Sequence, residues 1–463
     1  MITHEQALDL AATALDFELS ERDRVALDTH VAACPSCPAE IASLRRDAIR
    51  LRSLPPIAPP DWVAHAIGRT RRPVTMLLLA AVLLIGGSIG ALALAGSSPT
   101  TPTPSLDVVS VAPTASSQAT VGPPPLPRVA GWTPGRAMAG PRSFHIAIRL
   151  SNGEVLIAGG GFSGGNLASA ELYDPATDSF RPAASMSRPR ANTTATLLLD
   201  GRVLVAGSNG ATAELYDPAT DSWAMTGSML EQRSLPAAAL LPDGRVLVVG
   251  GAEGNAALRT AEIFDPATGQ WSSTPPGMSV GRYGFTATRL ADGRVLVAGG
   301  VTTQTGIDPL DSVEIFDPVT GTFTEAPPMH QARARHTAVL LADGRLLVAF
   351  GIDGGSVLAS SEVFDPATGT WMEVGDAEEP RESHSMTLLA DGGVIAVGGY
   401  SQGTTTTELF NPASGTWGSS GDTSTIRGFH GATLLADGRV LVTGGIDDTQ
   451  TQLASTELWL AEP

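Results

Sequence analysis

The chain has 463 residues, which is enough for two or three ordinary domains. Charged residues account for only 16% of the sequence, and the 51 Gly and 34 Pro favour strands and turns over helices. Residues 1–73 hold 9 Arg against 10 acidic residues, and the remainder holds 20 Arg against 37, a net charge of −17. This excess of acids argues against direct nucleic-acid binding by the larger part, because phosphate recognition needs a basic patch.

Residues 1–55 are predicted to form a small all-α domain that binds a metal. His30 and Cys34 are four residues apart near the end of a predicted helix, so both side chains lie on one face. Cys37 follows after a Pro-Ser turn that brings its thiolate back to the same point. Three ligands at this spacing favour a tetrahedral Zn²⁺. His4 is the only other His before residue 65 and is the expected fourth ligand.

Two other interpretations of the thiols stay open. Cys34 and Cys37 could form a redox-active disulfide, and oxidation would then eject the metal. The pair could also have neither role. A structural zinc is favoured because a helical domain this small needs a further cross-link to be stable.

The same segment resembles the zinc-binding anti-sigma domain. The resemblance rests on His30-xxx-Cys34-xx-Cys37, the upstream His4, an acidic first linker and a third predicted helix. A Pro-rich hinge and a juxtamembrane helix over 56–73 match the fourth helix of similar proteins. Members of that family bind sigma factors of the extracytoplasmic-function group and keep them from RNA polymerase. The resemblance implies that such a sigma factor is the cytoplasmic partner.

Residues 74–95 are predicted to be a single transmembrane helix. They carry no charge, and at ~1.5 Å per residue they cover the ~30 Å hydrocarbon core. Three Arg lie within 69–72, whereas the next is Arg128, so the positive-inside rule places the N-terminus in the cytoplasm. Gly86 and Gly90 form a GxxxG pair that could pack two such helices into a homodimer.

Residues 96–128 are predicted to be an extended linker. The stretch from 97 onward contains 8 Pro and 11 Ser or Thr, a composition that forms no core. With the orientation given above, the chain is expected to be a single-pass protein of the bacterial inner membrane. Everything after the predicted transmembrane helix is then extracytoplasmic.

Residues 129–463 contain seven copies of one β-repeat. Each copy has a turn, mostly Asp-Gly, then an apolar strand, then a strand with Glu-φ-φ-Asp-Pro (φ, an apolar residue), and in six copies an aromatic residue follows. The turn glycines are Gly153, Gly201, Gly244, Gly293, Gly344, Gly392 and Gly438. A period of about 43–51 residues with four short strands per copy is typical of propeller blades. The sequence therefore predicts a seven-bladed all-β propeller.

Two charged residues keep the same register in every copy. An Arg lies 11 residues before the turn glycine, at Arg142, Arg190, Arg233, Arg282, Arg333, Arg381 and Arg427. A Glu belongs to the third strand, at Glu171, Glu214, Glu262, Glu314, Glu362, Glu408 and Glu457. The distance from glycine to Glu varies between 13 and 21 residues, so the length variation falls in the loop between the second and third strands. Variable loops on a rigid scaffold are where binding specificity is usually placed.

The last copy lacks its aromatic fourth strand. A suitable strand occurs around Trp132 and is predicted to complete the seventh blade and close the ring. The repeats resemble kelch repeats of the galactose-oxidase-like kind, over residues 129–463. Galactose oxidases use a copper ion and a tyrosine crosslinked to a cysteine. These residues contain no Cys, so that cofactor is not expected.

Four copies place a His three residues after the Arg, at His145, His336, His384 and His430. One interpretation is a ring of imidazoles near the central channel that binds a metal or a ligand. The favoured interpretation is structural, because one register repeated in different blades indicates pairing within and between blades. The variable loops contain isolated acids, namely Asp308, Asp311, Asp353, Asp447 and Asp448, but no catalytic constellation.

The sequence thus predicts a multidomain, non-enzymatic protein: a small all-α zinc-binding domain, one transmembrane helix and a seven-bladed kelch propeller. Its expected function is a membrane-anchored anti-sigma factor whose propeller senses an unidentified ligand or protein. The alternative is an anchored, exported propeller that binds carbohydrate or protein or acts as an oxidase-like enzyme. An adhesin is a third possibility.

Overall fold

The computed structural model describes Thr29, His30, Cys34 and residues 130–461, except 163–164, 209, 304–307 and 400–403. The chain divides into two compact units, Met1–Pro113 and Thr114–Pro463. Apart from three residues of the first segment, the predictions for 1–55, 56–73, 74–95 and 96–128 lie outside the described residues. Among the residues that are described, no helix is long and apolar enough to cross a membrane.

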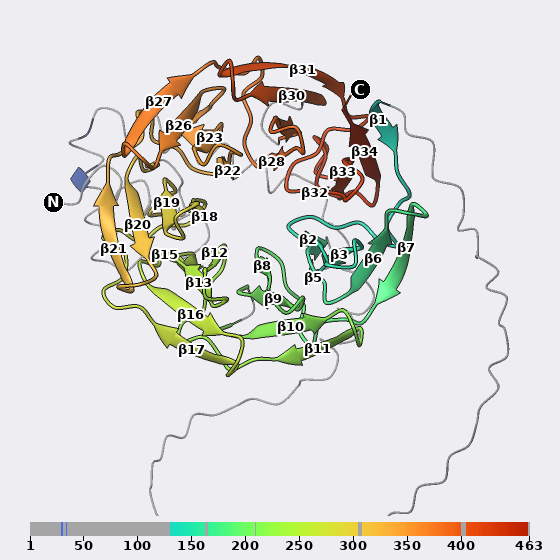
Figure 1. The fold of residues 1–463 in the computed structure, drawn as a ribbon, viewed down its shortest axis with the longest axis horizontal. Coiled ribbons are helices and arrows are strands. Elements are labelled where there is room, and N and C mark those ends of the chain that lie inside the picture. The colour runs from blue at the N-terminus through green and yellow to red at the C-terminus, as the bar shows by residue number, and fades with distance from the viewer. Residues whose placement is uncertain are drawn as a thin grey trace, which may run out of the picture. The chain divides into compact units, whose positions relative to one another are not determined.

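Seven four-stranded antiparallel sheets, the blades, are arranged in a ring (Figure 1). Blade 1 consists of β2 (Ile146–Arg149), β3 (Val155–Ala158), β6 (Ala170–Asp174) and β7 (Ser179–Ala183). Blade 2 consists of β8 (Thr194–Leu197), β9 (Val203–Ala206), β10 (Ala213–Asp217) and β11 (Ser222–Met225). Blade 3 consists of β12 (Ala237–Leu240), β13 (Val246–Val249), β16 (Ala261–Asp265) and β17 (Gln270–Ser273). Blade 4 consists of β18 (Thr286–Arg289), β19 (Val295–Ala298), β20 (Val313–Asp317) and β21 (Thr322–Ala326). Blade 5 consists of β22 (Thr337–Leu340), β23 (Leu346–Ala349), β26 (Ser361–Asp365) and β27 (Thr370–Val374). Blade 6 consists of β28 (Ser385–Leu388), β29 (Val394–Val397), β30 (Thr406–Asn411) and β31 (Thr416–Asp422). Blade 7 consists of β32 (Gly431–Leu434), β33 (Val440–Thr443), β34 (Thr456–Leu460) and β1 (Gly131–Pro134).

The second strand of each blade is apolar, apart from Thr443 in blade 7, because its two faces pack against neighbouring blades. All four residues of Val155–Ala158 are buried, and so are those of Val246–Val249. The third and fourth strands add one aromatic pair per blade in blades 1 to 6, with ring centroids 4.9–5.2 Å apart. The core is therefore a set of seams between blades rather than one central cluster.

The seventh blade is completed by the first described strand. β1 pairs antiparallel with β34, with Trp132 opposite Trp459 and Thr133 opposite Leu458. In Figure 1, β1 lies beside β34 although the two are at opposite ends of the described chain. The sheet order β1-β34-β33-β32 therefore closes the ring.

The antiparallel strands give the propeller two faces. The Asp-Gly turns and the Asp-Pro turns lie at one edge of every blade, which we name the turn face. The loops between second and third strands, and the segments that lead into each first strand, lie at the other edge, which we name the loop face. The variable loops and the residues around each register Arg therefore share the loop face.

Three variable loops contain short hairpins that the repeat pattern did not predict. They are β4 (Gly161–Phe162) with β5 (Gly165–Asn166), β14 (Ala252–Glu253) with β15 (Ala256–Ala257), and β24 (Ile352–Asp353) with β25 (Ser356–Val357). They occur in blades 1, 3 and 5 and extend the loop face of those blades.

Candidate binding face of the propeller

Each blade contains one buried ion pair between its register Arg and its Glu. The N···O distances are 2.7–3.0 Å in Arg142–Glu171, Arg190–Glu214, Arg233–Glu262, Arg282–Glu314, Arg333–Glu362, Arg381–Glu408 and Arg427–Glu457. Each pair joins the segment that leads into the first strand of a blade to the third strand of the same blade. The register found in the sequence is therefore a fold-stabilising device repeated seven times.

The pairs also hold the loop face together, as blade 1 illustrates. Arg142 Nη1 donates to the carbonyl oxygens of Gly159 and Ser169, at 3.0 and 3.1 Å, at the two ends of the variable loop. Glu171 Oε2 accepts from the backbone N–H of Ala139 at 2.8 Å, in the segment that leads into the blade. Burial lowers the pKa of Arg142, and the charge of Glu171 acts in the opposite direction. Apart from Arg142 Nε, which is buried without a partner among the described residues, the polar atoms of this pair are hydrogen-bonded within the scaffold and leave little for a ligand.

A ring of backbone hydrogen bonds surrounds the axis on the loop face. It is made by the residue two positions after each register Arg: Phe144, Asn192, Leu235, Gly284, Arg335, Ser383 and Phe429, all with φ between 52° and 63°. In six of these seven residues, all but Gly284, the N–H donates to the carbonyl of its counterpart in the preceding blade, with N···O distances of 2.7–3.4 Å. The ring uses only backbone atoms, so the repeat leaves the side chains at this position free to differ.

One part of this ring carries a polar group at the axis that the sequence analysis missed. Arg335 Nη1 donates to Glu382 Oε2 at 2.9 Å, and the Arg335 side chain is 50% exposed whereas that of Glu382 is 9% exposed. Tyr283, from the neighbouring blade, donates its hydroxyl proton to the carbonyl of Thr303 at 2.6 Å. Another part of the ring is apolar, because the rings of Phe144 and Phe429 pack there with their centroids 4.1 Å apart. The only sequence signal was that residues at these positions differ from blade to blade.

Three of the four register histidines bridge neighbouring blades. Nε2 of His145, His336 and His430 lies 2.7–3.1 Å from a hydroxyl oxygen of the preceding blade, in Thr443, Thr286 and Ser385 respectively. Burial lowers the pKa of each of these imidazoles to about 3, so they are neutral at ordinary pH. These contacts favour the structural interpretation over a ligand-binding ring.

His384 differs from the other three. Among the described residues neither of its ring nitrogens has a hydrogen-bond partner, and its ring packs edge-on against Phe350 with centroids 4.7 Å apart. Burial lowers its pKa well below the ordinary value.

The acids of the variable loops do not assemble into one site. Asp447 Oδ1 accepts from the backbone N–H groups of Thr449 and Thr451, at 2.9 and 2.8 Å, and so shapes its own loop. Asp353 Oδ2 accepts from Gln331 Nε2 at 3.1 Å. Within 130–461, leaving aside the gaps named above, no group of three His, Cys, Asp or Glu could hold a metal.

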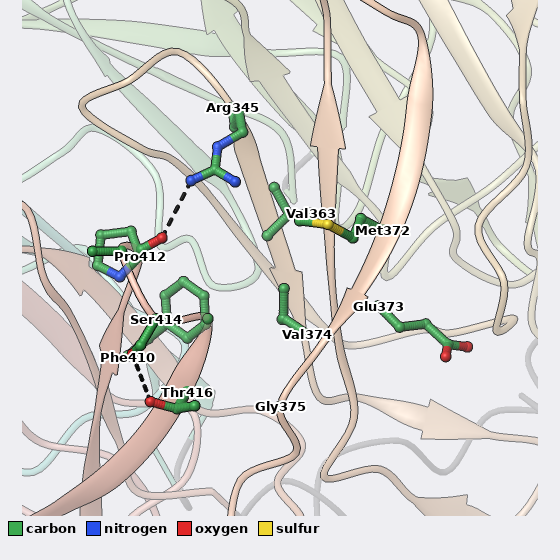
Figure 2. A pocket seen from close by; sticks show the side chains of 12 residues that line it. Arg345, Val363, Met372, Glu373, Val374, Gly375, Phe410, Pro412, Ser414 and Thr416 are labelled. Atoms are coloured by element: carbon green, nitrogen blue, oxygen red, sulfur yellow. Dashed lines mark hydrogen bonds between the residues drawn. The ribbon is translucent and has the colours of Figure 1, made fainter.

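Two clefts lie at seams between blades, toward the turn face. One, of about 390 Å³, lies between blades 5 and 6 and is lined by Val363, Met372 and Val374 on one side. Figure 2 shows Arg345 reaching from blade 5 to the carbonyl oxygen of Pro412 in blade 6, a distance of 3.3 Å. The other, of about 480 Å³, lies between blades 2 and 3 beside Leu199. None of the described residues that line them has a buried polar atom without a partner.

Of the four predicted zinc ligands, the structure describes two. The backbone N–H of Cys34 donates to the carbonyl of His30 at 2.9 Å, an i to i+4 bond, and His30 is helical. Both side chains are half-buried. His4 and Cys37 lie outside the described residues.

Two protein-family models match the chain. Residues 145–187 match the Kelch motif, and residues 210–399 match the KLHDC2/KLHL20/DRC7 Kelch-repeats domain. No curated protein matches it. Among solved structures, the chain is similar to a fungal alcohol oxidase of the AA5 family in complex with copper, with 20% identity and a TM-score of 0.61 over 72% of this chain and 77% of that one.

A second solved structure, YjhT, has 17% identity and a TM-score of 0.49 over 58% of this chain and 94% of that one. At these identities the oxidase supports the fold alone. The family models and the seven sheets agree on one statement. Residues 130–461 form a seven-bladed β-propeller built from kelch repeats.

Proposed function

We propose that the protein is a membrane-anchored anti-sigma factor. Residues 1–55 would hold an extracytoplasmic-function sigma factor in the cytoplasm, and residues 74–95 would cross the inner membrane, with Gly86 and Gly90 available to pair two copies. The kelch propeller would then be the extracytoplasmic domain that binds the signal. No bond-making chemistry is required of any part.

The observation that carries the cytoplasmic half is the hydrogen bond between Cys34 N–H and His30 O. One helical turn separates the two residues, so their side chains project from the same face, as two ligands of one metal must. Together with His4 and Cys37 they make a His₂Cys₂ donor set, which suits Zn²⁺. Bound zinc would supply the cross-link that holds the helices in a sigma-binding arrangement.

The proposed role of the propeller is supported by the loop face, where one set of residues stabilises the scaffold and another set differs from blade to blade. The seven Arg–Glu pairs form within the blades, and they anchor loops whose length differs from blade to blade. The side chains at the axial ring, such as Arg335 and Phe429, have no role that the repeat imposes. A rigid scaffold with variable loops and a variable axial ring is suited to specific binding.

The test is co-purification from native membranes with the tagged full-length chain, followed by mass spectrometry of bound proteins. We expect one sigma factor with the wild type and with Ser36→Ala, and its loss with the double variant Cys34→Ser/Cys37→Ser. Ser36 lies between the thiols but is no zinc ligand, so it controls for local disturbance. A sigma factor retained equally by the double variant would remove the zinc requirement.

The alternative is an anchored, exported propeller that binds carbohydrate or protein or acts as an oxidase-like enzyme. The observation that favours it is the half-exposed Arg335–Glu382 pair beside Tyr283 at the axis. If no sigma factor co-purifies with any form of the chain, this alternative becomes the better hypothesis. The lack of enzymatic activity stays a prediction.

A further inference from the structure

β1 is attached to the propeller differently from the other six outer strands. Each of those is joined to its neighbour by a tight turn, as β6 is joined to β7 through residues 175–178. β1 instead pairs with β34, and the hydrogen bond from Thr133 Oγ1 to Leu458 O joins residues 325 positions apart. No hairpin therefore holds β1 in register. When its hydrogen bonds break, no short turn keeps it nearby to re-form them.

Without a hairpin, β1 depends on its pairing with one strand, which is as long as that of β11 or β17, and on one side chain. It has four paired residues along one edge, all with β34. Its main side-chain anchor is the half-buried Trp132, whose Nε1–H donates to Thr407 Oγ1 of blade 6 at 3.0 Å. Gly131 and Pro134, at its two ends, contribute little side-chain packing. The strand is thus short, one-edged and fastened mainly by one indole.

The segment that follows β1 is bound by the variable loop of blade 7, residues 444–455. Backbone N–H groups of Met138 and Arg142 donate to Ala454 O and Leu453 O, at 2.9 and 3.1 Å, and Gly135 N–H donates to Thr456 O at 2.9 Å. This loop lies on the loop face, and the hydrogen bonds to Asp447 shape it. These hydrogen bonds connect the loop on the loop face to the chain just after β1.

We propose that β1 is a releasable clasp under the control of this loop. β1 and the segment to 141 dissociate together. This withdraws the buried Met138 side chain from the core between blades 7 and 1 and breaks the bond from Ala139 N–H to Glu171, whereas the Arg142–Glu171 ion pair remains and β32 to β34 stay folded. Release moves the point where the N-terminal part of the chain joins the propeller from Gly131 to Arg142. The freed residues span roughly 36 Å when extended. The clasp concerns the propeller alone and does not rest on the sigma-factor proposal.

The first experiment is hydrogen–deuterium exchange with mass spectrometry on the purified full-length chain. We expect the amides of 131–138 to exchange at least tenfold faster than those of the other outer strands, such as β7, β11 and β17. Thr407→Val removes the acceptor for Trp132 without changing side-chain volume and should accelerate exchange in 131–138 about fivefold further. Thr407→Ser, which keeps the hydroxyl, should restore the wild-type rate.

The matched control is Ser361→Ala, which removes the acceptor for Nε1 of Trp417 in the outer strand of blade 6, a bond of 2.8 Å. That strand is held by a hairpin, so its exchange should change less than twofold. Exchange of β1 in the unmodified chain that is as slow as in the other outer strands would overturn the clasp. This comparison needs no variant and stands even if one fails to fold.

Control by the loop is tested separately. Asp447→Ala removes the acceptor that shapes loop 444–455 and should accelerate exchange of 135–142 several-fold. Asp174→Ala removes a similar turn acceptor, for the N–H of Ala176, on the turn face of blade 1, and should leave 135–142 unchanged. Equal effects of the two variants, or no effect of Asp447→Ala, would show that the loop does not control the clasp.

Discussion

Phe350 packs against Ala377 at the seam between blades 5 and 6, and the two residues together replace a glycine and a methionine of other seams. A Cβ added to the equivalent Gly159 or Gly299 would meet first the backbone carbonyl oxygen of Arg190 or Arg333, and also a methionine Cε of the next blade, Met186 or Met329, at 3.0–3.2 Å. Ala377 occupies the methionine position in blade 6 and leaves room for the Phe350 ring, even though Phe350 has a φ of 64°. The seam accepts a residue with unfavourable backbone geometry because its ring fills the space.

This exchange predicts a coupled pair of substitutions. Phe350→Gly relieves the backbone but leaves a cavity, and should lower the free energy of unfolding by about 3 kcal/mol. Ala377→Met alone overpacks the seam and should cost about 1–3 kcal/mol. The double variant recreates the glycine–methionine arrangement and should recover more than ~1 kcal/mol of the summed loss. Urea unfolding of all four proteins measures this, and simple additivity would refute the coupling.

The buried ion pairs should be sensitive to the loss of one partner. Glu314→Gln leaves the buried Arg282 guanidinium without its counter-charge and should lower the free energy of unfolding by about 3–5 kcal/mol. The control is Asp243→Asn, which breaks the exposed pair with Arg245 and should change stability by less than ~1 kcal/mol. Chemical denaturation compares the two. Similar small effects would mean that the register Arg and Glu are not essential to the blade.

Metal content tests the predicted zinc site independently of any partner. The purified full-length chain should contain one zinc per chain by elemental analysis, and Cys34→Ser or Cys37→Ser should lose it. His4→Ala should also lose it if His4 is the fourth ligand. Ser36→Ala should keep the full content. Zinc retained by His4→Ala but lost by the cysteine variants would assign the fourth position to another group.

The kelch propeller was predictable from sequence because each blade repeats the same turn, apolar strand and buried ion pair. Every copy needs an Arg–Glu pair such as Arg333–Glu362 to anchor its loops, so the register was visible without a structure. The axial ring was not predictable, because it depends on backbone geometry that Phe144, Leu235 and Arg335 all adopt. Arg335 and Glu382 are brought together only by the packing of adjacent blades, which no spacing in the sequence encodes.

Stability should fall as the pH drops from about 6.5 toward 5. The pKa of His145, His336 and His430 is lowered to about 3 by burial, whereas an exposed His in the unfolded chain titrates near 6.5. Below 6.5 the unfolded state therefore binds more protons than the folded state, and the free energy of unfolding decreases with falling pH.

The carboxylates do not produce this effect in the same window. Asp200 and Asp292 also have lowered pKa values, but their contribution to stability is lost only below about pH 4. His336→Gln keeps a polar group near Thr286 and removes one titrating site, so the slope of stability against pH between 6.5 and 5 should be shallower than in the wild type. Urea unfolding at half-unit pH steps measures the slope. An unchanged slope would mean that His336 is protonated in the folded state, and that the seam between blades 4 and 5 admits water.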